Sequence, residues 1–136
     1  MGSELGIQFR AKFAAGWALS AADRATLLGW ADAVFDRPES ARFFEPGLRV
    51  ECEPEWTDGV EVYRPDRVAF DGHTWHIVDF KSGGQNKPKH VAQVQAYMQV
   101  LAGLEDAPIR GWLLYLEPWS LEEVPAPSAP LIFTSR

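Results

Sequence analysis

The sequence predicts an α/β protein with one mixed central β-sheet flanked by α-helices. Apolar residues repeat at helical spacing over residues 20–35 and again over residues 88–103. Between these stretches the pattern changes to that of strands over residues 49–81, and residues 109–116 form one more apolar strand. The predicted order of elements is therefore α-β-β-β-α-β, which fits one sheet with helices packed on it.

Length and composition indicate a single domain. The chain has 136 residues, of which 46% are hydrophobic, and this is enough for one core. We divide the domain into a helical part (residues 1–47), a core (residues 48–116) and a proline-rich tail (residues 117–136). The tail is expected to be irregular, with a short edge strand over residues 131–133. No apolar run approaches the ~18 residues of a membrane helix, so no membrane partner is expected.

Cysteine content and charge exclude several kinds of site. Cys52 is the only cysteine, which excludes an internal disulfide, a Cys-rich zinc site and a four-Cys iron–sulfur cluster. The absence of a signal-peptide pattern makes a cytoplasmic setting the expectation. The net charge of −6 argues against nucleic-acid binding through a broad basic surface. It is compatible with a cluster of carboxylates, because bound cations then supply the positive charge.

The N-terminal part has clear helix signals. Ser20 followed by Asp23 is a capping box, and apolar residues at helical spacing follow it as far as Phe35. Pro38 ends this helix and is expected to open a short one that runs through Phe44.

The remainder alternates strands and turns around a second helix. Strands are expected over residues 49–56, 60–70 and 74–81, with Asp71-Gly72 as the hairpin turn between the second and third. A helix is expected to begin at Pro88 or His90 and to run to about Gly103.

This hairpin brings chemically useful side chains onto one face. If the loop is Asp71-Gly72 alone, Asp79 is the diagonal neighbour of Asp66, roughly 7–8 Å away. If the loop has four residues, 71–74, Asp66 lies directly opposite Asp79. Either even length places Asp66, Asp79 and Lys81 on the same face of the sheet, because side chains alternate along a strand.

The shared face predicts a metal site. Carboxylate oxygens are preferred ligands of Mg²⁺ and Mn²⁺. Asp79 lies within the apolar segment 77–80, where a buried carboxylate needs a partner such as a cation. Lys81 can orient an attacking water or neutralise charge that develops on a phosphate. The plainer alternative is a solvated rim at the ends of two strands.

Three motifs follow one another with a strand, a hairpin, a strand and a helix between them. They are Asp66-Arg67, Asp79-Phe80-Lys81-Ser82, and Gln93 with Tyr97. In order and spacing they resemble the PD-(D/E)XK nuclease superfamily, and are most similar to its RecB-like branch at the C-terminus of bacterial helicase–nucleases. The resemblance covers residues 48–116, and more loosely the N-terminal helix.

The resemblance implies a restriction-endonuclease-like core and a DNA nuclease that depends on Mg²⁺ or Mn²⁺. It implies that Asp66, Asp79 and the backbone carbonyl of Phe80 bind the metal, and that Lys81 is the catalytic lysine. Gln93 and Tyr97 share a helix face and would position the substrate. The expected partners are DNA, single-stranded or at an end, and a helicase that is a separate protein or part of the parent chain. DNA repair or recombination is the expected setting.

An upstream acid often completes the site in this superfamily. Glu51, Glu53 and Glu55 project to one side of the first expected strand. Glu53 is the favoured third acid, since Trp56 then matches an aromatic residue of the family pattern, and Glu51 is the next choice. For any single one of these residues, an ordinary solvated strand edge is an equally good interpretation.

The most consequential departure from the family pattern lies in the first helix. The RecB-like branch carries a metal-binding His in its first helix, and Arg10 occupies that position here. Arginine cannot bind a cation, so Arg10 is expected to contact a substrate phosphate instead. This departure motivates a second hypothesis, in which the chain is a catalytically inactive DNA-binding or docking module. A third is a purely structural domain whose motif match is chance.

Positive charge is concentrated in the loop before the second helix. Lys87 and Lys89 flank the start of that helix, and a helix N-terminus favours anions. Both lysines are therefore candidate substrate-binding residues, and a solvated loop is the alternative. The three histidines lack a zinc-site spacing, and His76 is expected on the face opposite Asp79.

Overall fold

The computed structural model describes residues 8–9, 12 and 20–127. Its main sheet contains the strands β1 (Arg49–Cys52), β4 (Arg67–Phe70), β5 (Trp75–Lys81), β6 (Ile109–Leu116) and β7 (Trp119–Val124). They lie side by side in the order β1-β4-β5-β6-β7. β5 and β6 run parallel, and every other neighbouring pair runs antiparallel. The predicted mixed central sheet is therefore confirmed.

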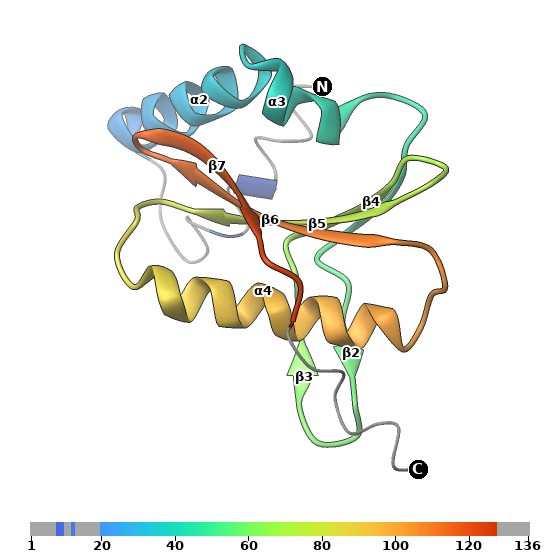
Figure 1. The fold of residues 1–136 in the computed structure, drawn as a ribbon. Coiled ribbons are helices and arrows are strands. Elements are labelled where there is room, and N and C mark those ends of the chain that lie inside the picture. The colour runs from blue at the N-terminus through green and yellow to red at the C-terminus, as the bar shows by residue number, and fades with distance from the viewer. Residues whose placement is uncertain (1–7, 10–11, 13–19, 128–136) are drawn as a thin grey trace.

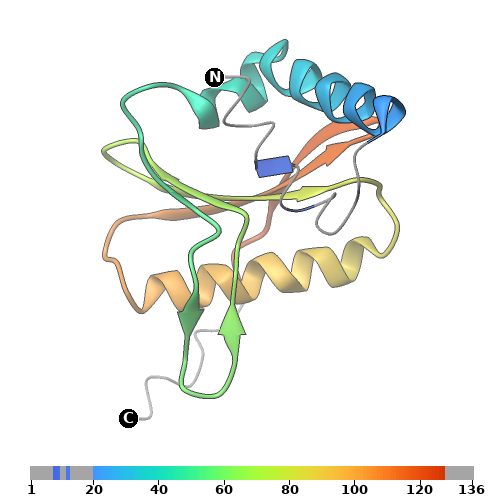
Figure 2. The same cartoon turned by 180° about the vertical axis from the view of Figure 1, so that it is seen from behind.

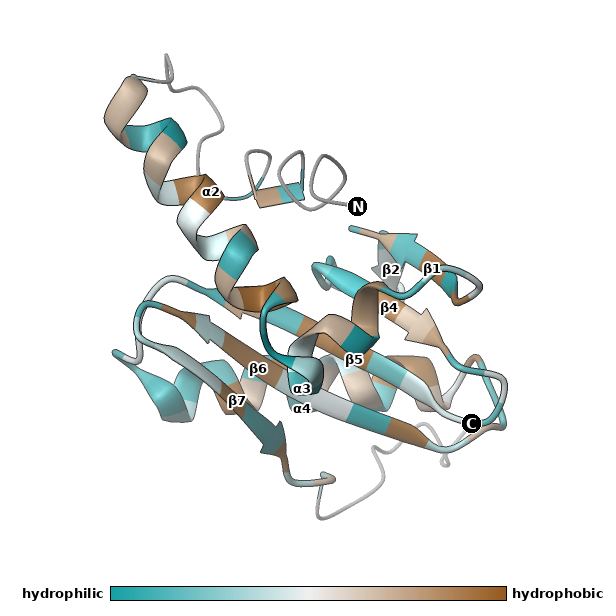
Figure 3. Ribbon diagram, turned by 90° about the horizontal axis from the view of Figure 1, so that it is seen from above, coloured by the Kyte–Doolittle hydropathy of each residue, from teal (hydrophilic) through white to brown (hydrophobic). Residues whose placement is uncertain are grey.

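Helices cover both faces of this sheet. Two helices, α2 (Ala21–Phe35) and the short α3 (Pro38–Ala41), lie on one face, and α4 (Lys87–Ala102) lies on the other (Figure 1). Viewed from above, α3 lies over the strands, α2 extends outward beyond the edge of the sheet, and α4 lies beneath the strands (Figure 3). α4 connects β5 to the parallel strand β6. Within the described ranges, no helix is long and apolar enough to cross a membrane.

The helix signals in the sequence act as expected. The Ser20 hydroxyl accepts a hydrogen bond from the Asp23 backbone N–H at 3.0 Å, and the Asp23 carboxylate accepts one from the Ser20 N–H at 3.4 Å. This reciprocal capping box starts α2. Pro38 opens α3, and a 3₁₀ turn, η1 (Arg42–Phe44), completes the short helical segment that the sequence predicts.

Alternation along the two central strands creates two cores. Val78 and Phe80 of β5 belong to the core beneath α2 and α3, whereas Ile77 belongs to the core against α4. Asp79 follows the same alternation and lies on the α4 face. The predicted site residues Asp79 and Lys81 therefore lie at the C-terminal end of β5, on the face of the sheet that α4 covers.

Close packing fixes α4 over the centre of the sheet. A Cβ atom added at Gly111 of β6 would lie 2.6 Å from Val94 Cγ1 and 2.7 Å from Met98 Sδ. Glycine is the residue that permits this approach of helix to strand. This contact holds α4 close to the sheet, so that Gln93 of α4 reaches Lys81 at the end of β5.

Two of the predicted strands are shorter than expected. The first ends at Cys52, because Glu53 has a φ of +48° and Pro54 has no N–H to continue the ladder. The second is interrupted at Arg64–Asp66, around Pro65. The residues between form a separate hairpin of β2 (Trp56–Thr57) and β3 (Val62–Tyr63). This hairpin extends away from the main sheet, past α4 (Figure 2).

The expectation of an irregular tail is wrong for its first part. β7 pairs with β6 along its whole length, from Leu116↔Trp119 to Gly111↔Val124. Pro118 and Pro125 flank this strand rather than interrupt it, so their missing N–H groups remove no bond from the ladder. The edge strand expected over residues 131–133 lies outside the described residues.

Candidate active site

The β4–β5 hairpin sets the position of the two aspartates. Phe70 pairs with Trp75 and Arg67 with Val78, so the loop has four residues, and the same register continued by one pair places Asp66 opposite Asp79. The Asp66 backbone N–H lies 3.4 Å from Asp79 Oδ1. Of the two loop lengths that the sequence allowed, the four-residue loop is therefore the one observed.

Local bonds explain this loop length. Asp71 Oδ1 accepts hydrogen bonds from the backbone N–H groups of His73, at 2.9 Å, and Thr74, at 2.7 Å. Gly72 takes a φ of +96°, which favours glycine. The side chain of Asp71 thus holds a turn that is two residues longer than the Asp-Gly signal alone indicates.

The two carboxylates are buried and electrostatically unfavourable. Asp66 is 5% exposed and Asp79 is 1% exposed. Burial, followed by the negative charge of Asp79, raises the pKa of Asp66 to about 8. Lys12 and a 2.8 Å hydrogen bond from the Phe80 N–H to Asp66 Oδ2 act in the opposite direction. The pair therefore holds its second negative charge only with help from a cation.

One oxygen of this pair lacks a hydrogen bond. Asp79 Oδ2 is fully buried and accepts none from the described residues. The Lys81 ammonium lies 2.9 Å away as an ion pair, so it supplies charge without a well-directed bond. An under-satisfied buried carboxylate oxygen beside a second carboxylate is suited to a hard divalent cation, whose preferred ligands are oxygens. These residues therefore fit a divalent metal ion.

The two α4 residues predicted for the site, Gln93 and Tyr97, lie close to Lys81 and the aspartate pair. The Lys81 ammonium donates to Gln93 Oε1 at 2.8 Å. One turn further along α4, Tyr97 donates to the Arg64 carbonyl at 3.4 Å. Burial, and then the charges of Asp79 and Asp66, raise the pKa of Tyr97. The structure thus brings Lys81, Gln93 and Tyr97 to the aspartate pair, as the motif spacing predicts.

Glu53 reaches the site through its backbone. Its N–H donates to the Asp66 carbonyl at 2.9 Å. Among the residues that the structure describes, no group of three or more His, Cys, Asp or Glu side chains could hold a metal ion. The structure therefore gathers two carboxylates, and Glu53 as a third acid stays a prediction, as does the Phe80 carbonyl. Arg10 lies outside the described residues.

Two residues of the N-terminal segment contact Asp66 and were not found from the sequence. Gln8 is 5% exposed, donates to the Asp66 carbonyl, and accepts from the Arg67 guanidinium at 3.3 Å. Lys12 forms an ion pair with Asp66 Oδ2 at 3.1 Å. The spacing of four between Gln8 and Lys12 was the available signal, because i and i+4 share a helix face.

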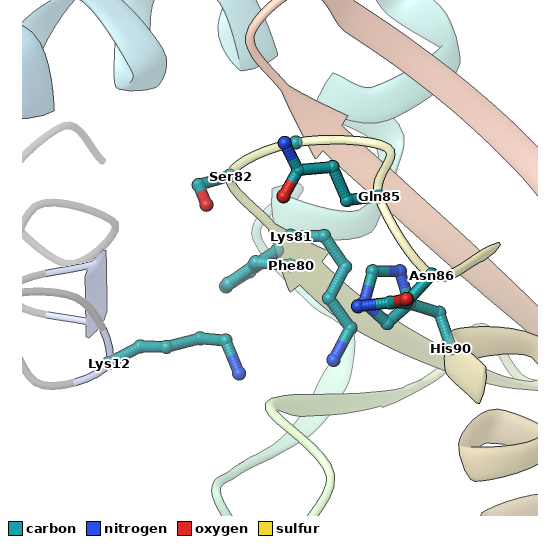
Figure 4. Close-up of a pocket in the computed structure, with 8 residues that line it drawn as sticks. Lys12, Phe80, Lys81, Ser82, Gln85, Asn86 and His90 are labelled. Carbon is teal, nitrogen blue, oxygen red and sulfur yellow. The ribbon is translucent and has the colours of Figure 1, made fainter.

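A cleft opens beside the two lysines that pair with the aspartates, and the lining residues do not include Asp66 or Asp79. It has a volume of about 390 Å³, and Figure 4 shows the ammonium groups of Lys12 and Lys81 pointing toward one another across it. A second hollow of about 570 Å³ shares Lys81 and His90 and adds Lys89. Lys89 therefore lines this second hollow, and its role in substrate binding stays a prediction.

Lys87 does not line either hollow. Its ammonium is 2.6 Å from Glu122 Oε2, on β7, and lies over the Tyr115 ring. His76 lies on the face opposite Asp79, where it pairs with Asp71 at 3.0 Å and accepts from the Trp112 indole at 3.1 Å. Its predicted side of the sheet is therefore confirmed.

The family model of the PD-(D/E)XK nuclease superfamily matches residues 5–129, which includes every element of this site. The chain belongs to the PD-(D/E)XK nuclease superfamily. Nucleases of this superfamily generally use divalent metal ions, in agreement with the paired carboxylates. The five-stranded mixed sheet with its helices is consistent with the restriction-endonuclease-like fold.

Individual similar proteins add little to this assignment. No curated protein matches the chain. One solved structure, described as the crystal structure of SSO0001, is 16% identical, with a TM-score of 0.45. The match covers 92% of this chain and 64% of that one, so this chain spans less than two thirds of its length.

Proposed function

We propose that this protein is a metal-dependent deoxyribonuclease that hydrolyses phosphodiester bonds. The observation that carries the proposal is the buried pair Asp66 and Asp79, with an under-satisfied oxygen facing Lys81. Two such carboxylates beside an ammonium are costly in a structural role, because burial disfavours their charged forms. They become favourable around Mg²⁺ or Mn²⁺.

In the proposal, Asp66, Asp79 and the carbonyl of Phe80 hold the metal, with Glu53 as a candidate fourth ligand. A bound divalent ion would supply a water nucleophile at neutral pH and stabilise charge on the phosphoryl oxygens. Lys81 neutralises charge that develops on the phosphate.

Residues of α4 support this lysine. Gln93 holds the Lys81 ammonium at 2.8 Å and so fixes its direction. Tyr97 excludes water from beneath the carboxylates, since it is itself buried beside them.

The substrate we propose is DNA, single-stranded or at an end. The cleft gathers the ammonium groups of Lys12 and Lys81 in a protein whose net charge is −6, so positive groups are concentrated at the site. Local charge suits a phosphate at the cleft better than binding along a broad surface. Lys89 extends the same path, and Arg10 and Lys87 stay candidate phosphate contacts.

The three-part motif supports a more specific assignment within the superfamily. We propose membership of the RecB-like branch, a role in DNA repair or recombination, a helicase partner or parent chain, and a cytoplasmic location. Asp66-Arg67, Asp79-Phe80-Lys81-Ser82 and the pair Gln93 and Tyr97 support the branch. A single domain with a small local cleft is suited to substrate delivered by another domain or protein.

A cleavage assay on end-labelled single-stranded and double-stranded DNA tests this function. We expect products with Mg²⁺ or Mn²⁺, none with a chelator, and a loss of at least about 100-fold in Asp79→Asn and Lys81→Met, typical of lost charge stabilisation. Arg110→Met is the matched control, because Arg110 is exposed and bound to Glu123 at the opposite end of β6. Unchanged cleavage in Lys81→Met would overturn the proposal.

One observation favours a second function. Lys12 already neutralises Asp66 through an ion pair, which suits a fold that has lost catalysis and binds or docks DNA. That alternative predicts DNA binding strengthened by Mn²⁺ without products in the same assay. Cleavage that requires Lys81 excludes it.

A further inference from the structure

The two carboxylates of the site are each matched by one lysine. Lys12 Nζ lies 3.1 Å from Asp66 Oδ2, and Lys81 Nζ lies 2.9 Å from Asp79 Oδ2. The side chains of these lysines are 25% and 14% exposed, so both ion pairs are largely withdrawn from water. The protein therefore places one ammonium group beside each aspartate of the pair.

The two lysines are held differently. Lys81 is fixed at the end of β5 and makes a second bond, to Gln93 at 2.8 Å. Lys12 reaches the pair from the N-terminal segment and approaches from the other side of the cleft (Figure 4). Its target, Asp66 Oδ2, also accepts the Phe80 N–H at 2.8 Å. Because Asp66 Oδ2 already contacts the Lys12 ammonium and the Phe80 N–H, little room remains at this oxygen for a metal ion.

A divalent cation at this oxygen would conflict with the ammonium. A metal–oxygen distance of about 2.1 Å at Asp66 would leave the cation within a few ångströms of Lys12 Nζ. Like charges at such separation repel strongly in a buried site, where water screens them poorly. Binding of the metal at Asp66 therefore requires the Lys12 ammonium to withdraw.

We propose that Lys12 is a built-in counter-ion that competes with the divalent metal for Asp66. This inference rests on the proposed function, because it assigns a role to Lys12 at the same metal site. In the metal-free protein Lys12 stabilises the carboxylate pair. When the metal binds, the Lys12 ammonium moves away from Asp66 and into the cleft that Lys12 and Lys81 both line. The ion pair therefore lowers metal affinity and stabilises the fold before the metal arrives.

Calorimetric titration with Mn²⁺, without DNA, tests the competition. Lys12→Met keeps the length of the side chain and removes its charge, and we expect its Mn²⁺ affinity to be roughly tenfold tighter than in the wild type. Lys12→Gln keeps a donor to Asp66 without charge and should show the same direction. Lys12→Arg keeps the charge and should stay within about twofold of the wild type.

Lys89→Met is the matched control. It removes one positive charge from the cleft region without touching either aspartate, and should change Mn²⁺ affinity by less than about threefold, since exposed charges are well screened. Equal or weaker affinity in folded Lys12→Met and Lys12→Gln would overturn the inference and leave the proposed function standing. Absence of Mn²⁺ binding in the wild type and every variant would overturn both.

Discussion

The raised pKa of Asp66 makes the stability of the metal-free protein depend on pH in an unusual direction. Burial and the charge of Asp79 raise this pKa to about 8, far above the ordinary value of 3.8. The folded protein thus binds a proton that the unfolded chain releases. The stabilising contribution is complete below the unfolded pKa and is lost as pH rises through the folded pKa. Removal of this carboxylate by Asp66→Asn should therefore remove the effect.

The size of the effect follows from the pKa. Between pH 6.5 and pH 8 the unfolded aspartate is fully ionised, whereas the folded one releases about half of its proton. Linkage then predicts a loss of about 1–2 kcal/mol in the free energy of unfolding over this interval. For a domain of this size that corresponds to roughly 5 °C in Tm. His76 and His90 have lowered pKa values, so their titration falls below this window.

Thermal denaturation with a chelator, at pH 6.5 and pH 8, measures this prediction. The fall in Tm should be larger in the wild type than in Asp66→Asn by roughly 5 °C. Groups distant from the aspartate pair that titrate in this interval contribute about equally to both proteins and cancel in the difference. Identical pH dependence in the two proteins would refute a raised Asp66 pKa, and with it the unfavourable burial of the pair.

Three further changes test the fold and the site together. Gly111→Ala should lower the free energy of unfolding by about 1–3 kcal/mol in urea, because the added methyl group clashes with α4, and wild-type stability would contradict the close packing. Ser20→Ala should cost about 1 kcal/mol through loss of the capping box with Asp23, and a Tm unchanged within error would show that the cap is dispensable. Gln93→Ala should lower kcat for DNA cleavage by roughly tenfold with little change in KM, because Lys81 loses the acceptor that orients it. A change confined to KM would instead place Gln93 in substrate binding.

The elements with strong local signals could be predicted from the sequence. The capping box marked α2, and the apolar segments marked β5 and β6, the latter with the predicted bounds of 109–116. The even loop length was enough to place Asp66, Asp79 and Lys81 on one face. The choice between two and four loop residues depended on the Asp71 side chain, which a dipeptide signal does not describe.

Other features had weak or misleading local signals. Strand β7 was not predicted, because Pro118 and Pro125 indicate irregular structure and the apolar signal from Leu121 and Val124 is weak. Gln8 and Lys12 lie more than fifty positions from Asp66, and their spacing of four indicates a shared helix face but not that this face contacts Asp66. Long-range contacts of this kind become visible only when the fold brings the two segments together.

Anomalous diffraction from crystals grown with Mn²⁺ tests the central claim most directly. We predict a manganese peak between the carboxylates of Asp66 and Asp79, within bonding distance of an oxygen from each, and the Lys12 ammonium withdrawn from Asp66. Crystals saturated with Mn²⁺ that show no peak at this pair, or a peak only at exposed carboxylates elsewhere, would contradict the assignment of this site as a metal-dependent nuclease centre.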